Sequence, residues 1–265
     1  MIKYKENFGS ILNREKLNFK NNKQLEQYYE KKWATEGYKK GYKLFGINIS
    51  KIIHKQRLGI SFDFLKPKKD EIILDAGCGN GDLALKIAKK SKVFAVDISK
   101  NAFFCAKNKT QKNLTFLKMN IEHLKFKNKM FDKIVCVETL EHVLHPEKVL
   151  KEFSRVIKQK GKLILTYPTI DKTIIAKTEN FFRIRSLTNV SEHMTEWDYN
   201  AVIKKLEKYN FKFIEAKGIF FDLGRLNFIK KISKKIMLLV LKIELYITNF
   251  PKNSLFVAFV FEKNK

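Results

Sequence analysis

The stretch ILDAGCGNGD, residues 73–82, places three glycines at alternating positions directly after an apolar run that ends in Asp75. Glycines let a backbone approach a ligand closely, and a helix that begins after such a loop offers unpaired N–H groups to it. The spacing is G-x-G-x-G, at Gly77, Gly79 and Gly81, whereas dinucleotide-binding loops are spaced G-x-G-x-x-G. Asp75 would repel a pyrophosphate and suits a ligand that carries an ammonium group.

A second acidic residue, Asp97, closes the next apolar run, 22 residues after Asp75. An acid at the end of the second strand of an α/β unit can hold both hydroxyl groups of a ribose. The following run ends in Asn-Ile-Glu, where Asn120 offers a side-chain amide to the edge of an adenine ring. An ammonium group, a ribose and an adenine together describe S-adenosylmethionine. The alternatives are a helix N-cap for Asp97 and a plain loop residue for Asn120.

The stretch ETLEH follows the fourth apolar run and holds Glu138, Glu141 and His142 at positions i, i+3 and i+4. On a helical turn these residues share one face, so they can bind a divalent cation such as magnesium. A histidine ligand also admits manganese, iron or zinc. Without a metal, His142 can act as a general base, or the stretch shapes the loop beside the cofactor. His193 is a candidate second base or fourth ligand, with a surface-loop histidine as the alternative.

Apolar runs that alternate with helical patterns position these residues. Strands are predicted at 71–77, 92–99, 114–121, 131–138 and 162–168, and helices at 81–90, 100–109 and 145–161, the last with Gly161 past its end. This alternation predicts a doubly wound α/β sheet, mostly parallel, with helices on both faces. A helix at 198–211 and strands at 211–221 and 254–263 follow, and the last two strands are predicted to form an antiparallel edge.

Two regions flank or interrupt this pattern. Residues 1–66 are predicted to form a polar tail and a helical cap, with helices at 23–37 and 49–67. The α/β domain is predicted at 67–265. Within it, residues 169–196 lack a clean period and are predicted to be an inserted lid, and residues 225–250 a long helix that is both basic and strongly apolar.

The order of the motifs resembles class I S-adenosylmethionine-dependent methyltransferases over residues 70–265. ILDAGCGNGD is similar to the first motif of that family, VFAVDIS to the second, and NIE to the loop beside the adenine. The resemblance implies a Rossmann-like fold. The cofactor-binding residues that it implies are Asp75, Ala76, Gly77, Cys78, Gly79, Gly81, Asp97, Ile98, Asn120, Ile121 and Glu138. One departure, KQKG in place of a Pro-Gly-Gly turn before the fifth strand, concerns a structural turn and no site residue.

Two subfamilies carry a similar E-x-x-E-H sequence, namely the ubiquinone-biosynthesis O-methyltransferases and the small-RNA 3′-terminal 2′-O-methyltransferases. The resemblance to them implies a metal that lowers the pKa of an acceptor hydroxyl and orients it. The ubiquinone type is the nearer, because its lid has the same chain position. The expected reaction is methyl transfer from S-adenosylmethionine to a small-molecule or lipid-linked acceptor, at a hydroxyl group. An RNA 2′-O-methyltransferase and a non-catalytic nucleotide-binding protein are the alternatives.

Composition bears on partners and location. The formal net charge is +27, which attracts anions, but only six of the 54 basic residues are arginine, so RNA is the weaker candidate partner. Lysines beside the apolar residues of 225–250 fit peripheral contact with an anionic membrane. The three cysteines form no zinc or disulfide pattern, and the N-terminus lacks the apolar stretch of a signal peptide. A cytoplasmic protein, peripheral to the membrane at most, is expected.

Overall fold

The computed structural model describes residues 17–35, 43–44, 47–102, 111–169, 192–219, 251–254 and 256–264, together with the helical positions 236, 239 and 243. The helix predicted at 100–109, the lid predicted at 169–196 and the basic helix predicted at 225–250 lie mostly outside these residues.

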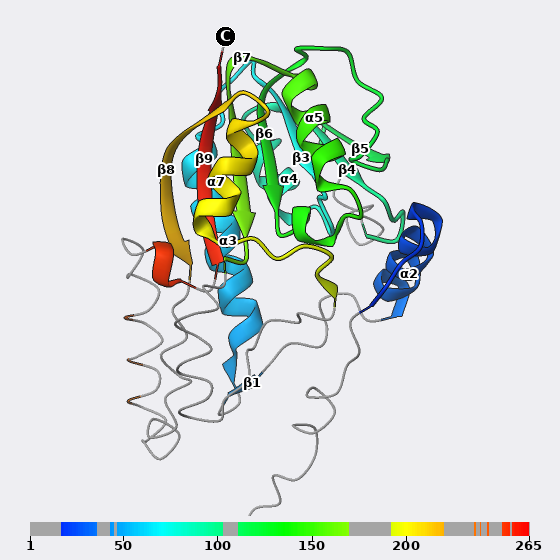
Figure 1. The fold of residues 1–265 in the computed structure, drawn as a ribbon, viewed down its shortest axis with the longest axis vertical. Helices are drawn as coiled ribbons and strands as arrows, with labels where there is room; N and C mark the ends of the chain where they lie inside the picture. Colours follow the sequence, from blue (N-terminus) through cyan, green and yellow to red (C-terminus); the bar gives the residue numbers. More distant parts are fainter. Residues whose placement is uncertain are drawn as a thin grey trace, which may run out of the picture.

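The described residues form a seven-stranded sheet in the order β5-β4-β3-β6-β7-β9-β8 (Figure 1). The strands are β3 (Ile72–Ala76), β4 (Lys92–Asp97), β5 (Leu114–Lys118), β6 (Phe131–Val137), β7 (Ile157–Tyr167), β8 (Phe211–Ile219) and β9 (Phe256–Lys263). Neighbours from β5 to β7 pair in parallel, whereas β9 is antiparallel to both β7 and β8. The predicted α/β sheet, mostly parallel with an antiparallel last strand, is confirmed.

Helices cover both faces of this sheet (Figure 1). The helical segments are α2 (Asn22–Thr35), α3 (Ile49–Leu65), α4 (Asp82–Ile87), α5 (Pro146–Val156) and α7 (Tyr199–Glu207), with the short 3-10 turns η2 (Leu140–His142) and η6 (Pro251–Asn253). A two-residue hairpin, β1 (Lys43–Leu44) and β2 (Ile47–Asn48), leads into α3. One buried cluster joins α3 and α4 to the sheet, and a second joins α5 and α7 to the opposite face. The strands between these clusters are buried on both faces, which explains their continuous apolar sequences.

The predicted helix at 145–161 is too long at its C-terminal end. Helix α5 ends at Val156, and Ile157 already has extended backbone angles and pairs with Phe131 of β6. The carbonyl of Val156 accepts a hydrogen bond from the N–H of Met130, so it pairs with the residue just before β6 and does not continue the hydrogen bonds of α5. Gly161 lies inside β7, where an added Cβ would come within 2.9 Å of the Asp132 carbonyl oxygen. This glycine therefore permits a close backbone approach and is not a helix cap.

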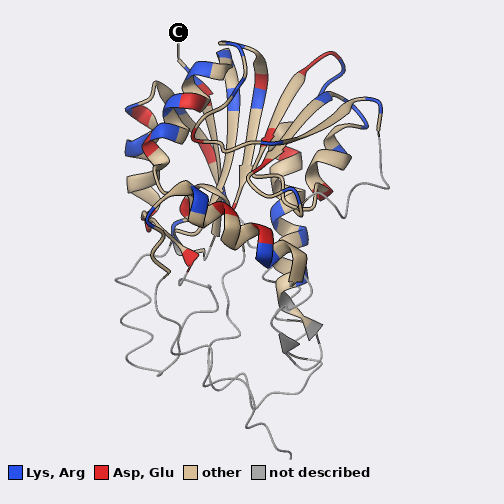
Figure 2. Ribbon diagram, turned by 90° about the vertical axis from the view of Figure 1, so that its right-hand side faces the viewer, with Lys and Arg blue, Asp and Glu red and all other residues tan. Residues whose placement is uncertain are grey.

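Basic residues are spread over both helical layers and the loops, with no single stripe in the view of Figure 2. Four of the buried acidic residues, Asp75, Asp97, Glu141 and Glu192, belong to the site described below. Among the residues that the structure describes, no helix is long and apolar enough to cross a bilayer.

We expect Phe153→Ala to lower the free energy of unfolding by about 3–5 kcal/mol, because it removes a ring from a filled core. The Phe153 side chain on α5 is fully buried among residues of β6 and β7. Chemical denaturation measures the change, and Lys151→Ala, at an exposed position of the same helix, is the control. Equal stability of the two variants would contradict this packing.

Candidate active site

A cavity of 820 Å³ lies at the carboxyl ends of the parallel strands. Ligands of open α/β sheets bind at this edge. Ten of the residues proposed from the sequence line it, namely Asp75, Gly77, Cys78, Gly79, Asp97, Ile98, Asn120, Ile121, Glu138 and His142. Ala76 is fully buried at the end of β3, and Gly81 is the N-cap of α4, so both shape the backbone of the same loop.

The glycine loop has a backbone that side chains would disrupt. Gly77, Gly79 and Gly81 have φ angles of 77°, 51° and 74°, which L-residues rarely adopt. A Cβ on Gly77 would also lie 2.2 Å from the Thr139 side chain. The N–H of Gly79 donates to the Asp97 carboxylate over 3.0 Å, so the loop and the end of β4 form one unit.

Asp75 and Asp97 are buried carboxylates on neighbouring strands. Their exposed fractions are 2% and 8%. Burial raises the pKa of Asp75 to about 7, with a contribution from the charge of Asp97. Burial likewise raises the pKa of Asp97 to about 6, although the N–H groups of Ser99 and Gly79 lower it. One oxygen of Asp75 accepts no hydrogen bond from any described residue. The pair is therefore suited to a ligand that brings positive charge and hydroxyl donors.

The side of the cavity that is predicted to receive the adenine is built by the chain after β4 and the chain after β5. Ile98, Met119 and Ile121 supply apolar walls there. The side-chain oxygen of Asn120 accepts from the N–H of Glu122 over 2.9 Å, which fixes the orientation of the amide. A contact between the Asn120 amide and an adenine edge stays a prediction.

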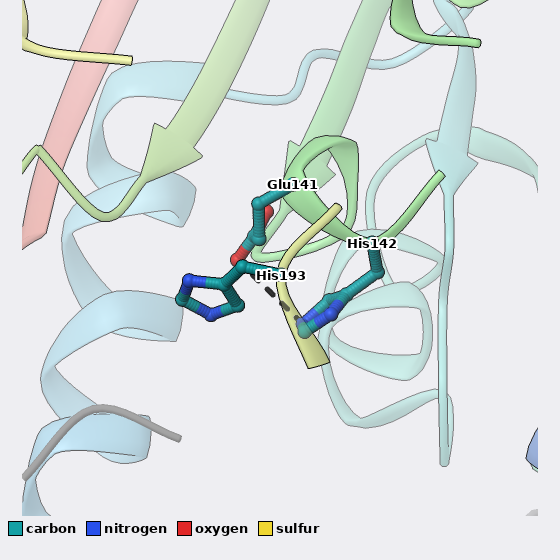
Figure 3. Close-up of side chains that lie close together, drawn as sticks. All are labelled: Glu141, His142 and His193. Atoms are coloured by element: carbon teal, nitrogen blue, oxygen red, sulfur yellow. Dashed lines mark ion pairs between the residues drawn. The ribbon is translucent and has the colours of Figure 1, made fainter. Parts of the chain in front are cut away.

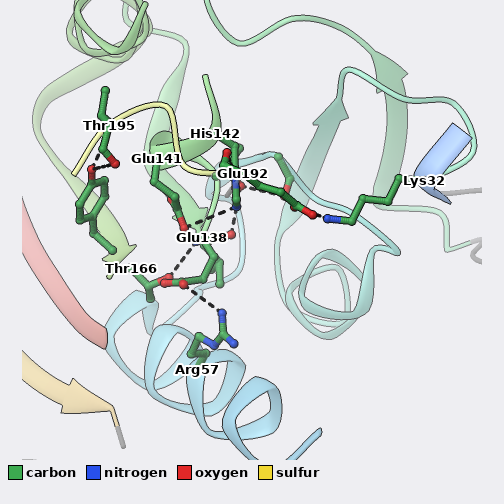
Figure 4. Close-up of polar contacts among 12 residues, drawn as sticks. Lys32, Arg57, Glu138, Glu141, His142, Thr166, Glu192 and Thr195 are labelled. Carbon is green, nitrogen blue, oxygen red and sulfur yellow. Dashed lines mark hydrogen bonds and ion pairs between the residues drawn. The ribbon is translucent and has the colours of Figure 1, made fainter. Parts of the chain in front are cut away.

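Glu138 is held in a strained position by two partners. Its φ angle is 48°, a region in which a non-glycine residue costs of the order of 1–3 kcal/mol. Its N–H donates to the Thr166 hydroxyl over 3.0 Å, and its carboxylate lies 3.0 Å from Arg57 Nη1 (Figure 4). Burial raises the pKa of Glu138, while Arg57 opposes that shift. Arg57 was not singled out from the sequence, although an arginine in so lysine-rich a chain was a usable signal.

Glu141, His142 and His193 come together beside the cavity (Figure 3). One ligand atom from each lies within 4.8 Å of the others. Glu141 is fully buried, and neither of its oxygens accepts a hydrogen bond from a described residue. Burial, reinforced by the charge of Glu138, raises its pKa well above the usual value. The sequence proposed Glu138, Glu141 and His142 as ligands, with His193 as a candidate fourth. The described geometry groups His193 with Glu141 and His142 and pairs Glu138 with Arg57.

The tautomer of His142 follows from its surroundings. Its Nδ1 lies 3.0 Å from the backbone carbonyl of Glu192, which can only accept, so Nδ1 carries the hydrogen. Nε2 then offers a lone pair and lies 3.8 Å from a Glu141 oxygen. Burial lowers the pKa of His142, which favours this neutral form. Two electron-pair donors that face each other call for a proton or a cation between them.

The free energy of unfolding of the ligand-free protein should fall as the pH rises from 5 to 8. The folded protein holds the proton of Asp75 up to about pH 7. An unfolded chain releases it near a pKa of about 3.9, so folding favours the protonated form and loses stability by up to about 1.4 kcal/mol per pH unit. Urea denaturation at each pH should give a shallower fall for Asp75→Asn. Asp63→Asn, at an exposed position of α3, is the control, and identical slopes for the Asp75 variant and the wild type would refute the assignment.

Comparison with known proteins agrees with this site. A methyltransferase-domain family matches residues 67–218. An uncharacterized protein of Methanocaldococcus jannaschii is 31% identical over 216 residues, covering 82% of this chain and 85% of its own. A ubiquinone biosynthesis O-methyltransferase of Rickettsia typhi is 30% identical over 226 residues, covering 79% of this chain and 86% of its own.

The fold is also found among solved structures. Magnesium protoporphyrin IX methyltransferase from Synechocystis PCC 6803, solved with bound S-adenosylhomocysteine, superposes with a TM-score of 0.62 at 15% identity. The match covers 92% of this chain and all of that one. The motif order, the acid-lined cavity and the family match together lead to one conclusion: this chain belongs to the S-adenosylmethionine-dependent methyltransferases.

Proposed function

We propose that this enzyme transfers the methyl group to a hydroxyl of a small-molecule or lipid-linked acceptor. The observation that carries the proposal is the position of His142, which lines the cofactor cavity and has an Nε2 lone pair beside the Glu141 carboxylate. A base or a metal centre at that place acts on an acceptor proton. The relative of Rickettsia typhi, named for an O-methyltransferase reaction, supports the same class of acceptor.

Cofactor binding is assigned to the two buried acids. Asp75 would receive the ammonium group of the cofactor, and Asp97 the hydroxyls of its ribose. The sulfonium group is also a cation, so a wall that contains Asp75, Asp97 and Glu138 is electrostatically suited to it. Arg57 lies on the same wall and pairs with Glu138 through Nη1, and its Nε, which meets no partner among the described residues, is a donor for the carboxylate of the cofactor.

The reaction itself needs alignment more than activation, because a sulfonium methyl group is already electrophilic. The acceptor oxygen forms a bond to the methyl carbon as the carbon–sulfur bond breaks, and the electron pair remains on sulfur in S-adenosylhomocysteine. The hydroxyl proton passes to Nε2 of His142. The Glu192 carbonyl keeps Nδ1–H in place throughout, so the ring presents the basic nitrogen to the acceptor.

The same three side chains also fit a divalent cation. Glu141, His142 and His193 would hold it. The observation that favours it is that both Glu141 oxygens lack a hydrogen-bond partner among the described residues. A bound metal supplies a lowered pKa for the acceptor hydroxyl. The carbonyl of Glu192 would then hold the Nδ1–H group of His142 in place and leave Nε2 as the ligand atom, as is common for histidine ligands of metals.

We expect His142→Gln to lower turnover by a factor of 100 or more, on the usual scale of general-base loss, with S-adenosylhomocysteine affinity changed less than about twofold. Turnover is followed with methyl-labelled S-adenosylmethionine and a lipid extract, and affinity by calorimetry. His123→Gln, on the exposed surface, is the control. If affinity falls in parallel with turnover, His142 is a cofactor-binding residue and the proposal fails.

Manganese(II) alone should bind the wild-type protein and be detected by electron paramagnetic resonance. Glu141→Gln should abolish the binding, because it removes the only carboxylate of the grouped ligands, whereas Glu138→Gln should retain it. Binding that depends on Glu138 and not on Glu141 would restore the ligand set proposed from the sequence. A wild-type protein that binds no manganese would leave His142 as a metal-free base.

Contact with an anionic membrane is the accompanying proposal on location, with the rest of the protein in the cytoplasm. Three apolar side chains at the helical positions Ile236, Leu239 and Ile243 are about half exposed, at 48%, 57% and 47%. Their spacing, i, i+3 and i+7, would place them on one side of the helix predicted at 225–250. Such a stripe, in a basic segment, supports access to a lipid-linked acceptor.

Replacing Ile236, Leu239 and Ile243 by serine should weaken binding to phosphatidylglycerol vesicles at least tenfold in a sedimentation assay, because their apolar burial is lost. The activity towards a water-soluble acceptor should persist. Ile214→Ser, at an exposed position on β8, is the control. Equal vesicle binding by the triple variant and the wild type would remove the membrane from the proposal.

A further inference from the structure

Helix α2 precedes the methyltransferase motifs in the chain, yet it contacts the turn that follows β4. The Glu30 carboxylate accepts from the Ser99 hydroxyl over 2.7 Å and from the N–H groups of Lys100 and Asn101 over 2.9 and 3.1 Å. It also pairs with Lys118 of β5 at 3.0 Å. Burial raises the pKa of Glu30, but these donors outweigh it and bring the pKa to about 2, so the group stays ionised.

This turn is the one that orients Asp97. The N–H of Ser99 donates to one Asp97 oxygen over 3.0 Å, while Gly79 donates to the other. The Ser99 hydroxyl in turn donates to Glu30. The carboxylate assigned to the ribose is therefore fixed through a backbone segment that a side chain of α2 holds.

Helix α2 also contacts the acceptor end of the site, where Lys32 pairs with Glu192 (Figure 4). The Tyr28 hydroxyl donates to one oxygen of Glu192 over 2.9 Å, and Lys32 forms an ion pair with the other. Glu192 has an exposed fraction of only 6%, so its charge needs this compensation. The backbone carbonyl of Glu192 is the group that fixes the tautomer of His142.

Helical geometry explains how one helix serves both ends. Tyr28 and Lys32 are four residues apart and share a face, whereas Glu30 is about 200° around the axis from Tyr28. Helix α2 therefore lies between the ribose turn and Glu192. Tyr29 lines the cavity, its ring lies 6.1 Å from that of His142, and its buried hydroxyl meets no hydrogen-bond partner in the described residues.

We propose that α2 is a positioning element for methyl transfer, with Glu30 holding the ribose turn and Lys32 with Tyr28 holding Glu192 and thereby His142. Cofactor binding, which orders the turn, then orders the acceptor side through the same helix. The catalytic meaning of His142 rests on the proposed function, but the coupling itself is a property of α2 and can be measured without turnover.

The test is hydrogen exchange with and without S-adenosylhomocysteine. The N–H groups of Met194 and Thr195 donate to the Glu141 carbonyl, so their exchange reports on the segment that holds His142. In the wild type, S-adenosylhomocysteine should slow their exchange at least fivefold. Glu30→Gln should weaken the affinity about tenfold and, at saturating ligand, remove the slowing.

Lys32→Met should keep the affinity within about threefold but also remove the slowing, and it should lower kcat more than it raises KM. Lys31→Met is its control, because it removes the same charge from an exposed position of the helix. Glu26→Gln is the control for Glu30, since Glu26 pairs with Lys118 and has no contact with the turn among those described. Tyr28→Phe, which deletes one hydroxyl, repeats the Lys32 test if that variant does not fold.

Slowing that persists in Glu30→Gln and Lys32→Met, as in the two controls, would overturn the proposal. Failure of the proposed function is seen separately, as turnover retained by His142→Gln, and leaves the exchange result unaffected. If Glu30→Gln and Lys32→Met lose the ligand-induced slowing of exchange at Met194 and Thr195 while the two controls keep it, α2 is the element that couples the cofactor side to the acceptor side.

Discussion

The charge balance of this site depends on two carboxylates that are buried side by side at the ends of adjacent parallel strands. The β3–β4 register pairs Asp75 with Ala95 and Ala76 with Val96, so Asp75 and Asp97 emerge at the same edge of the sheet. Burial makes ionisation of both groups costly in the empty protein, and the charge of Asp97 adds to that cost for Asp75. Two of the cations that line the cavity are already paired with other acids, since Arg57 pairs with Glu138 and Lys32 with Glu192. A cationic ligand resolves the conflict, and the fold thereby selects the class of cofactor.

The charge of the cavity is opposite to that of the chain. A protein with a formal charge of +27 has a cavity in which buried acids outnumber the cations that pair with them. The exterior attracts anionic partners at long range, and an anionic membrane would be one of them. The interior favours the ammonium and sulfonium groups of the cofactor, and phosphates of an RNA acceptor would meet Glu138 and Glu192 there. The overall charge therefore bears on the anionic surface that the protein approaches, whereas the charge of the cavity bears on the cationic ligand that it binds.

Sequence patterns predicted the parts of the site that depend on one strand and its following loop. Asp75, Asp97 and the glycines belong to this class, because an apolar run, an acid and a turn lie within a few residues of each other. The partner of Glu138 escaped prediction, since Arg57 comes from a helix 81 residues earlier in the chain. The contact of Glu30 with Ser99 spans 69 residues for the same reason.

The start of β7 was missed for a different cause. Residues 157–161, Ile-Lys-Gln-Lys-Gly, carry no alternation that distinguishes a strand from a continuing helix. The strand is imposed by tertiary pairing, through Phe131 opposite Ile157. The prediction that Glu138 shares a face with Glu141 and His142 assumed a regular helical turn at the i, i+3, i+4 spacing. In the structure Glu138 has left-handed backbone angles, and Leu140–His142 form a 3-10 turn.

The position of β9 between β7 and β8 in the sheet has a consequence for the synthesis of the protein on the ribosome. β8 ends at Ile219, but its hydrogen-bonding partner is not synthesised until residues 256–263. A nascent chain that has emerged only as far as β8 carries two strands, β7 and β8, each with an unpaired edge that waits for the same segment. Such edges recruit foreign strands readily. The interval between the emergence of residues 219 and 263 is therefore a period in which β7 and β8 each expose an edge that β9 later covers.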